Sequence, residues 1–392
     1  MTAEADVYRG AELAGRLSRT KHGSVFEYDP TFLKGERSIA FRLPWEQRRF
    51  ETVGVNVHPF FAGLLPEGLR LQALVRRVKT SKDDLLSLLI AAGADCIGDV
   101  SVVPTGERPR DASPAVDVAR VSEVSFAEVL RKSLGSTTEG TIPGVQAKVS
   151  AAMISLPVRA DRAYILKLNP PDAPLLVENE HFFMAAARAC GLRPAQVRLV
   201  HDREGRSGLL VARFDRHEGG KLHQEDACQL LDLYPADKYR LSVRDAMQAL
   251  EDCSAPRVER LKLLRLVAFS YLIGNGDLHG KNVSVRTIDG RTELTPAYDL
   301  LSTLPYGDTH MAMKLEGRDA NLRRSTFVAA GERFAIPRRA TEGVLDELVA
   351  QIEPFYARLP EIGFDAKRTR ALERALRKRA ADVAPSMRSG GN

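Results

Sequence analysis

Several features that define whole classes of protein are absent from this sequence of 392 residues. Nothing in it approaches the roughly 18 consecutive apolar residues that a membrane-spanning helix needs. The richest apolar run, residues 85–92, is short and is followed by Gly93 and Asp95. Residues 1–9 carry acids and lack the apolar segment of a secretory signal. We therefore expect a cytoplasmic protein without a membrane partner.

Cysteine is scarce as well, and its placement excludes two further classes. The four cysteines lie far apart, with no Cys-x-x-Cys pair and no neighbouring cluster of histidines. This spacing argues against a zinc site and a disulfide framework, and it favours reduced, buried thiols.

The net charge of +6 is modest for the length. It would suit contacts with phosphates or acidic surfaces, and we do not expect the chain to bind DNA on its own.

The N-terminal part of the chain alternates strand-like and helical patterns. Strand-like stretches such as 24–28 and 38–43 precede an apolar helix at 83–92. A stretch rich in proline and charge follows at 104–120 and is typical of a linker or surface loop. This order predicts a mixed α/β unit at the N-terminus.

The rest of the chain passes from strands to helices. We expect a helix at 179–190, closed by Gly191, and strands at 149–154, 163–168, 197–201 and 208–214. Beyond residue 225 helices dominate, among them 257–273, 338–359 and 365–383. A β-rich half followed by a helical half predicts an α+β fold with two lobes and a cleft between them.

The most informative segment is YLIGNGDLHGKNVSVR, residues 271–286, which places Asp277 and Asn282 just before an alternating strand. Phosphoryl transfer needs a carboxylate that orients the attacking hydroxyl and accepts its proton. It also needs oxygen ligands for Mg²⁺ close by, and an asparagine side chain supplies one. Taken alone, the D-x-x-x-x-N pattern is weak evidence, because about one is expected by chance in a chain of this length. Asp277 could also be a turn residue that caps the next strand.

A second carboxylate follows at a suitable distance. Asp299 lies in LTPAYDL, residues 294–300, and Asp289-Gly290 between the two stretches is a good two-residue hairpin turn. The hairpin would bring Asp299 back beside Asn282 and give Mg²⁺ two ligands. Turn chemistry alone would also explain an asparagine and an aspartate at these positions.

Upstream segments contain the parts that would hold a nucleotide. Lys167 stands near the end of the apolar strand YILKL, where its ammonium could reach the α- and β-phosphates. Glu180 opens the next helix and could pair with that lysine, although Glu178 lies two positions away. Before both, the loop GTIPGVQAK at 140–148 would let backbone N–H groups approach phosphates. The order of loop, lysine, helix glutamate, catalytic aspartate, asparagine and metal aspartate is that of protein-kinase-like folds.

Segments along most of the chain resemble the sequence motifs of a known protein family. They are TIPGVQAK, YILKLNP, ENEHFFMAAARACGL, LLVARFDR, LHQEDACQLL, GNGDLHGKN and LTPAYDLLS, and, nearer the N-terminus, VYRGAELAGRL, FEYDPTFL, FFAGLLPEG and DLLSLLIAAGADCIGDVSVVP. Together they resemble the HipA-type serine/threonine kinases, the toxin halves of bacterial toxin–antitoxin pairs. The resemblance runs over about residues 6–360 and includes residues with no generic role, such as Gln224, Glu225 and Asp226.

The resemblance implies a two-lobed, protein-kinase-like fold. A HipA-type α/β domain would occupy residues 1–106, and a kinase N-lobe with the phosphate loop and the hinge would occupy 107–216. A helical C-lobe with the catalytic loop would span 217–384, followed by a disordered tail at 385–392.

It also implies roles for individual residues in a reaction that uses ATP and Mg²⁺. Asp277 and Lys281 would be catalytic, Lys281 through the γ-phosphate, and Asn282 and Asp299 would bind the metal. The ATP-binding residues would be Gly144, Val145, Gln146, Lys148, Lys167, Glu180, Arg213, Phe214 and His279. His279 would mainly brace the catalytic loop through hydrogen bonds.

Two positions depart from the family pattern. Ala212 stands in the hinge where family members often carry an acid, so side-chain contacts with the nucleotide are in doubt there. Thr141 stands where the family usually has an autophosphorylated serine, and its hydroxyl could instead cap its own backbone.

The implied partner is a DNA-binding antitoxin of the HipB type, through which alone the chain would reach DNA. The implied substrate is a protein of translation, in this family often an aminoacyl-tRNA synthetase. The main alternative is a small-molecule kinase of the aminoglycoside or choline type, because those enzymes share a GD-x-H-x-x-N loop that residues 276–282 approximate. The N-terminal domain and the QEDACQ segment argue against it. A pseudokinase that acts only as a repressor partner is a further alternative, but all the metal and lysine positions are filled.

Overall fold

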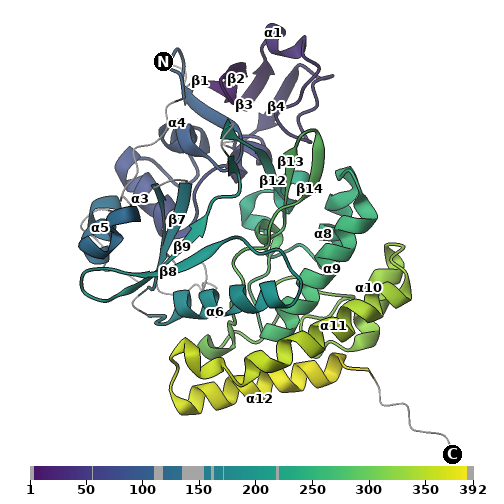
Figure 1. Ribbon diagram of the computed structural model, residues 1–392. Helices are drawn as coiled ribbons and strands as arrows, with labels where there is room; N and C mark the ends of the chain where they lie inside the picture. Colours follow the sequence, from purple (N-terminus) through teal and green to yellow (C-terminus); the bar gives the residue numbers. More distant parts are fainter. Residues whose placement is uncertain are drawn as a thin grey trace, which may run out of the picture.

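The computed structural model describes residues 4–54, 56–109, 118–134, 154–159, 163–170, 172–217 and 220–385. The predicted α+β architecture is confirmed, with sheets in the N-terminal part and helices gathered in the C-terminal part (Figure 1). The four cysteines are free and buried, as expected. No helix among the described residues is long and apolar enough to cross a membrane.

The N-terminal unit is built on a five-stranded antiparallel sheet. Its strand order is β4-β3-β2-β1-β5, formed by β1 (Glu4–Arg9), β2 (Glu12–Thr20), β3 (Gly23–Tyr28), β4 (Arg49–Val53) and β5 (Val100–Pro104). Four helices accompany it, α1 (Pro30–Leu33), α2 (Pro59–Gly63), α3 (Gly68–Val78) and α4 (Leu85–Ala92). In the core, the Phe26 ring packs edge-on against Tyr28 and Phe61, with centroids 4.7 and 5.2 Å apart. Such pairs add to the free energy gained by burying apolar surface.

Residues 38–43 do not form the predicted strand, and this expectation is wrong. Ile39, Ala40 and Leu43 are buried as a strand pattern would require, but the backbone turns, with Leu43 N–H donating to Ala40 O. The Ile39 N–H donates to the Tyr28 hydroxyl, and the Phe41 N–H donates to Glu225 Oε1. Since side chains take up these backbone donors, the segment needs no neighbouring strand.

The second unit is a four-stranded antiparallel sheet with the order β6-β7-β9-β8. It consists of β6 (Ile154–Arg159), β7 (Ala163–Leu168), β8 (Val197–His201) and β9 (Ser207–Ala212), with α5 (Phe126–Leu134) and α6 (Leu176–Ala189) beside it (Figure 1). Successive residues of β9 face opposite sides. Leu210 packs in the cluster that contains Phe126, whereas Leu209 and Val211 pack in the cluster that contains Phe183 of α6.

The third unit is mainly helical and shares the largest core with α6 and β9 of the second unit. Its elements are α7 (Ala227–Leu230), α8 (Val243–Ala249), α9 (Pro256–Ile273), α10 (Arg324–Arg333), α11 (Arg338–Tyr356) and α12 (Ala366–Val383), together with a sheet of β12 (His223–Asp226), β13 (Ser284–Ile288) and β14 (Arg291–Leu294). A short ribbon of β10 (Arg216–His217) and β11 (Gly220–Lys221) precedes it. The helices predicted at 257–273 and 365–383 are confirmed to within one residue, and that at 338–359 ends at Tyr356.

The predicted hairpin at Asp289-Gly290 is confirmed. Ile288 pairs with Arg291 across the turn, which leaves two residues in the loop. Both have positive φ angles, +48° at Asp289 and +74° at Gly290, as the tight turn that matches strand twist requires.

Candidate active site

A cavity of about 360 Å³ opens where the three units meet. The four-stranded sheet contributes Ile165, Lys167 and Val211 to its wall, and the helical unit contributes His279, Lys281, Asn282 and Asp299. The N-terminal unit lines the third side with residues 63–70 and 95–97. A cavity of this size suits a small organic ligand.

Lys167 lies between two carboxylates. Its Nζ is 2.7 and 2.8 Å from the two carboxylate oxygens of Glu180, and it also donates to Asp299 Oδ1. Burial disfavours the ammonium, but the charges of Asp299 and Glu180 outweigh it and raise the pKa of Lys167, which therefore stays protonated. Glu178 is not the partner, because Asn169 Nδ2 donates to its carboxylate at 2.9 Å. Helix α6 begins three residues before the predicted start, so Glu180 lies in its second turn.

Asp299 lies beside Asn282, and the hairpin of β13 and β14 brings them together. Asn282 Nδ2 donates to Asp299 Oδ2 at 3.0 Å. Asp299 has a φ of +57°, a conformation that a non-glycine residue adopts at some cost and that often marks functional sites. The chain beyond it is held by Asn179 of α6, which accepts from Ser302 N–H and donates to Ser302 O.

Asp277 follows the glycine that ends α9. Gly274 has a φ of +69° and closes the helix, and Gly276 is packed so tightly that a Cβ would lie 2.6 Å from His310 O. Asp277 is buried, and its Oδ1 accepts a hydrogen bond of 3.0 Å from the Tyr239 hydroxyl. The Tyr239 ring packs edge-on against His279, with centroids 5.0 Å apart. Asp277, Tyr239 and His279 thus form one contiguous group.

His279 and Lys281 extend this group toward the N-terminal unit. The backbone of His279 exchanges hydrogen bonds with Asn282, which fits its predicted bracing role. Lys281 Nζ donates to Gly63 O at 3.1 Å and lies 3.3 Å from Asp226. The predicted contact of Lys281 with a γ-phosphate stays a prediction.

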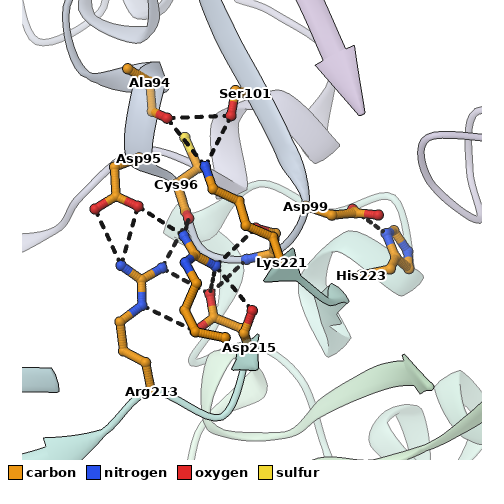
Figure 2. Close-up of polar contacts among 11 residues, drawn as sticks. Ala94, Asp95, Cys96, Asp99, Ser101, Arg213, Asp215, Lys221 and His223 are labelled. Atoms are coloured by element: carbon orange, nitrogen blue, oxygen red, sulfur yellow. Dashed lines mark hydrogen bonds and ion pairs between the residues drawn. The ribbon is translucent and has the colours of Figure 1, made fainter. Parts of the chain in front are cut away.

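The predicted hinge residues lie in the cavity wall, but the Arg213 guanidinium is already bound. It contacts Asp95 at 3.3 Å and Asp215 at 2.8 Å and donates to Cys96 O (Figure 2). Its contact with a nucleotide therefore remains a prediction, and its observed contacts tie the hinge to the N-terminal unit. Phe214 packs against Tyr298, with ring centroids 5.5 Å apart.

Five of the predicted site residues lie outside the described residues, namely Thr141, Gly144, Val145, Gln146 and Lys148. Their roles stay predictions.

Several residues at the site were not predicted. Tyr239 contacts Asp277, Glu67 pairs with Lys238 at 2.7 Å, and Asp226 pairs with Lys281. These pairs join residues far apart in the chain, and no local spacing signals them. The only sequence signal was the QEDACQ segment, whose Glu225 and Gln229 bond to the backbone of the N-terminal unit at Phe41 and Phe60.

Comparisons with known proteins agree with this arrangement. The family described as "HipA-like C-terminal domain" matches residues 140–354, and "HipA N-terminal domain" matches residues 5–103. A relative from Sinorhizobium fredii (strain NBRC 101917 / NGR234), "Putative kinase Y4mE", is 30% identical over 384 residues, covering 88% of this chain and 91% of the relative. "Serine/threonine-protein kinase toxin HipA" of Shewanella oneidensis is 27% identical, over 64% of each chain.

A solved structure shows the same fold. The HipA chain of the Shewanella oneidensis HipA, HipB and operator DNA complex superposes with a TM-score of 0.79 and 21% identity, over 96% of both chains. The fold is thus the two-lobed, protein-kinase-like one, and the class is that of the kinases. Within that class, the chain belongs to the HipA family.

Proposed function

We propose that this protein transfers the γ-phosphate of ATP to a serine or threonine of another protein, with Mg²⁺ as the metal. The observation that supports it best is the set of Lys167, Glu180, Asn282 and Asp299, which direct hydrogen bonds join. Lys167, Asn282 and Asp299 line the cavity, and Glu180 is buried behind Lys167. Kinase-type phosphoryl transfer depends on such a lysine–glutamate pair at the phosphates and on an aspartate and an asparagine at the metal.

The residues present fit Mg²⁺. Asn282 and Asp299 are in direct contact, since Asn282 Nδ2 donates to Asp299 Oδ2. Their side chains carry an amide and a carboxylate oxygen, the ligand types that this metal prefers. The Asp299 carboxylate already attracts a cation, the Lys167 ammonium. Bound Mg²⁺ would neutralise charge on the phosphates. Asp277 would orient the attacking hydroxyl, since its Oδ1 already accepts a hydrogen bond from a hydroxyl, that of Tyr239.

Two substitutions test the reaction. Asp277→Ala should slow phosphate transfer by about 10²–10⁴-fold, the usual loss when a positioned base is removed, with ATP affinity retained. Asp299→Ala should abolish transfer and also weaken binding of Mg²⁺ with ATP. Transfer of radiolabelled phosphate is measured with a cell lysate as acceptor, and circular dichroism checks that both variants fold. Labelling by Asp277→Ala at the wild-type rate would overturn the assignment.

The same assay separates the protein kinase from the alternative. The purified protein is also offered a panel of aminoalcohols and aminoglycosides. Transfer to one of these compounds, with none to protein, would favour a small-molecule kinase.

We further propose that the protein is the toxin of a toxin–antitoxin pair, acts in the cytoplasm and pairs with a HipB-type DNA-binding antitoxin. The named HipA relative and the solved HipA complex with HipB and operator DNA support this. The target would be a translation protein such as an aminoacyl-tRNA synthetase. Expression without the partner should arrest growth, and Asp299→Ala should not. Normal growth at a high wild-type level would count against the toxin role.

Self-phosphorylation of Thr141 belongs to the same proposal. A phosphate adds about −1.5 to −2 charges beside an anionic nucleotide, so it would lower ATP affinity and act as a brake. Peptide mass analysis after incubation with Mg²⁺ and ATP tests it, with Thr141→Ala and Thr141→Ser alongside. An unmodified Thr141 in protein that phosphorylates other proteins freely would exclude the brake.

A further inference from the structure

Arg70 of the N-terminal unit lies in the wall of the cavity, and nothing above gives it a role. It stands in the first turn of α3, and the stretch from Gly63 to Arg70 forms one side of the cavity. The N-terminal unit is therefore in a position to contact whatever binds there.

The other basic side chains of the cavity are already paired. Among the described residues, five lysines and arginines line the cavity, namely Arg70, Lys167, Arg213, Lys238 and Lys281. Four have carboxylate partners, namely Glu180 and Asp299 for Lys167, Asp95 and Asp215 for Arg213, Glu67 for Lys238, and Asp226 for Lys281. Within the described part of the chain, Arg70 is the member of this set with no hydrogen bond or ion pair. The protein itself thus leaves one cation of the cavity without an anion.

The surroundings make this unpaired charge unfavourable. Burial lowers the pKa of Arg70, and the charge of Arg213 lowers it further, with only partial compensation from Asp95. Asp95 is held by other groups, by Arg213 at 3.3 Å (Figure 2) and by Arg216 at 2.8 Å. Arg70 is half-buried, and a cation withdrawn from water without a partner costs free energy unless a bound anion satisfies it.

We propose that Arg70 binds a phosphate group of the nucleotide, so that the N-terminal domain supplies a direct ligand contact. A guanidinium presents a planar fork of donors that matches two phosphate oxygens. The same cavity holds Lys167 and the hinge residue Phe214, the groups expected to contact the nucleotide. This inference rests on the proposed kinase function, because it assumes that ATP occupies the cavity.

The test is calorimetric binding of ATP, ADP and adenosine, each with Mg²⁺, to the full chain and to Arg70→Gln. A lost charge-assisted contact should weaken ATP or ADP binding by about 10- to 100-fold and leave adenosine unchanged. Arg70→Lys keeps the charge without the fork and should fall between. Lys82→Gln, an exposed cation of the same domain, controls for net charge and should bind as the wild type does.

A thermal melt separates ligand binding from a structural role. Since Arg70 has no partner among the described residues and the charge of Arg213 disfavours its own, Arg70→Gln should melt without nucleotide at or above the wild-type temperature. ATP should raise its melting temperature less. Wild-type ATP affinity in Arg70→Gln, an equal loss for adenosine, or a lower melting temperature without nucleotide would each overturn the proposal. Failure of the wild-type protein to bind ATP would instead overturn the proposed function, and this inference with it.

Discussion

At the scale of single residues, Tyr239 contacts the aspartate that we propose to be catalytic. Its hydroxyl donates to Asp277 Oδ1 at 3.0 Å, and its ring packs on His279. Burial and the nearby charge of Asp277 raise the pKa of Tyr239, so the phenol remains a donor at physiological pH. In the proposed reaction, Tyr239 would therefore position the Asp277 carboxylate.

Tyr239→Phe keeps the ring and removes the hydroxyl. One lost hydrogen bond to a charged group corresponds to about a 10-fold effect, so kcat should fall by about that factor while KM for ATP stays unchanged. Tyr239→Ala should lose more, because His279 also loses its packing partner. Steady-state kinetics on a protein acceptor measures both, and an unchanged kcat in Tyr239→Phe would show that the contact is incidental.

The sequence predicted best the residues whose order along the chain matches that of protein-kinase-like folds. Glu180 was predicted to pair with Lys167, and Asp299 to lie beside Asn282, and each pair is joined by a hydrogen bond. The contact between Lys167 and Asp299 was not predicted. The direction of the Arg213 side chain could not be predicted, because it depends on Asp95, which lies 118 positions earlier in the chain.

At the scale of elements, the sequence predicted turns and strands correctly where local residue preferences decide the structure. The Asp289-Gly290 turn and the strand at 163–168 follow from turn residues and apolar alternation, and both were predicted correctly. The stretch 38–43 has the same alternation, but its backbone donors bind Tyr28 and Glu225. Tertiary contacts decide such cases, and a single sequence does not show them.

The hairpin turn gives a prediction at this scale. Gly290 has a φ of +74° and open space around it, so Gly290→Ala meets backbone strain without a steric clash. The strain should cost about 1 kcal/mol and lower the melting temperature by roughly 2–4 °C. Gly343→Ala, inside α11 and also in open space, should be neutral or stabilising. Differential scanning calorimetry of both proteins makes the comparison, and equal melting temperatures would contradict it.

At the scale of the whole molecule, the N-terminal domain is joined to the kinase unit by buried polar contacts. Figure 2 shows Lys221 reaching Ala94 and Ser101 and His223 facing Asp99. The order of the units was predictable from the sequence, since each has its own periodic pattern. The interface between the units was not predictable, because single side chains from distant segments of the chain form it. These contacts place Arg70 and Gly63 at the cavity and make the N-terminal domain part of the site.

The polar interface between the N-terminal domain and the kinase unit predicts how the free energy of unfolding depends on pH. His223 is buried between Asp99 at 3.0 Å and Glu225 at 2.9 Å, and Arg9 also contacts Asp99. Burial alone would lower the pKa of His223, but the hydrogen bonds and charges of Asp99 and Glu225 raise it from 6.5 to about 9. The stabilisation is therefore complete below about pH 6.5 and is lost as the pH rises through about 9. It corresponds to about 3 kcal/mol.

His223→Gln removes this titration while keeping a polar group between the carboxylates. Its urea midpoint should lie below that of the wild type at pH 6, and the two should converge between about pH 6.5 and 9, because over this range the folded wild-type protein keeps a proton on His223 that the unfolded chain has lost. His201→Gln, an exposed histidine of β8, should keep the wild-type pH dependence. The proton on His223 lies between the N-terminal domain and the kinase unit, so the same pH rise should loosen the wall that holds Arg70 and weaken ATP binding. Parallel urea curves for wild type and His223→Gln over this range would show that His223 is uncharged in the folded protein.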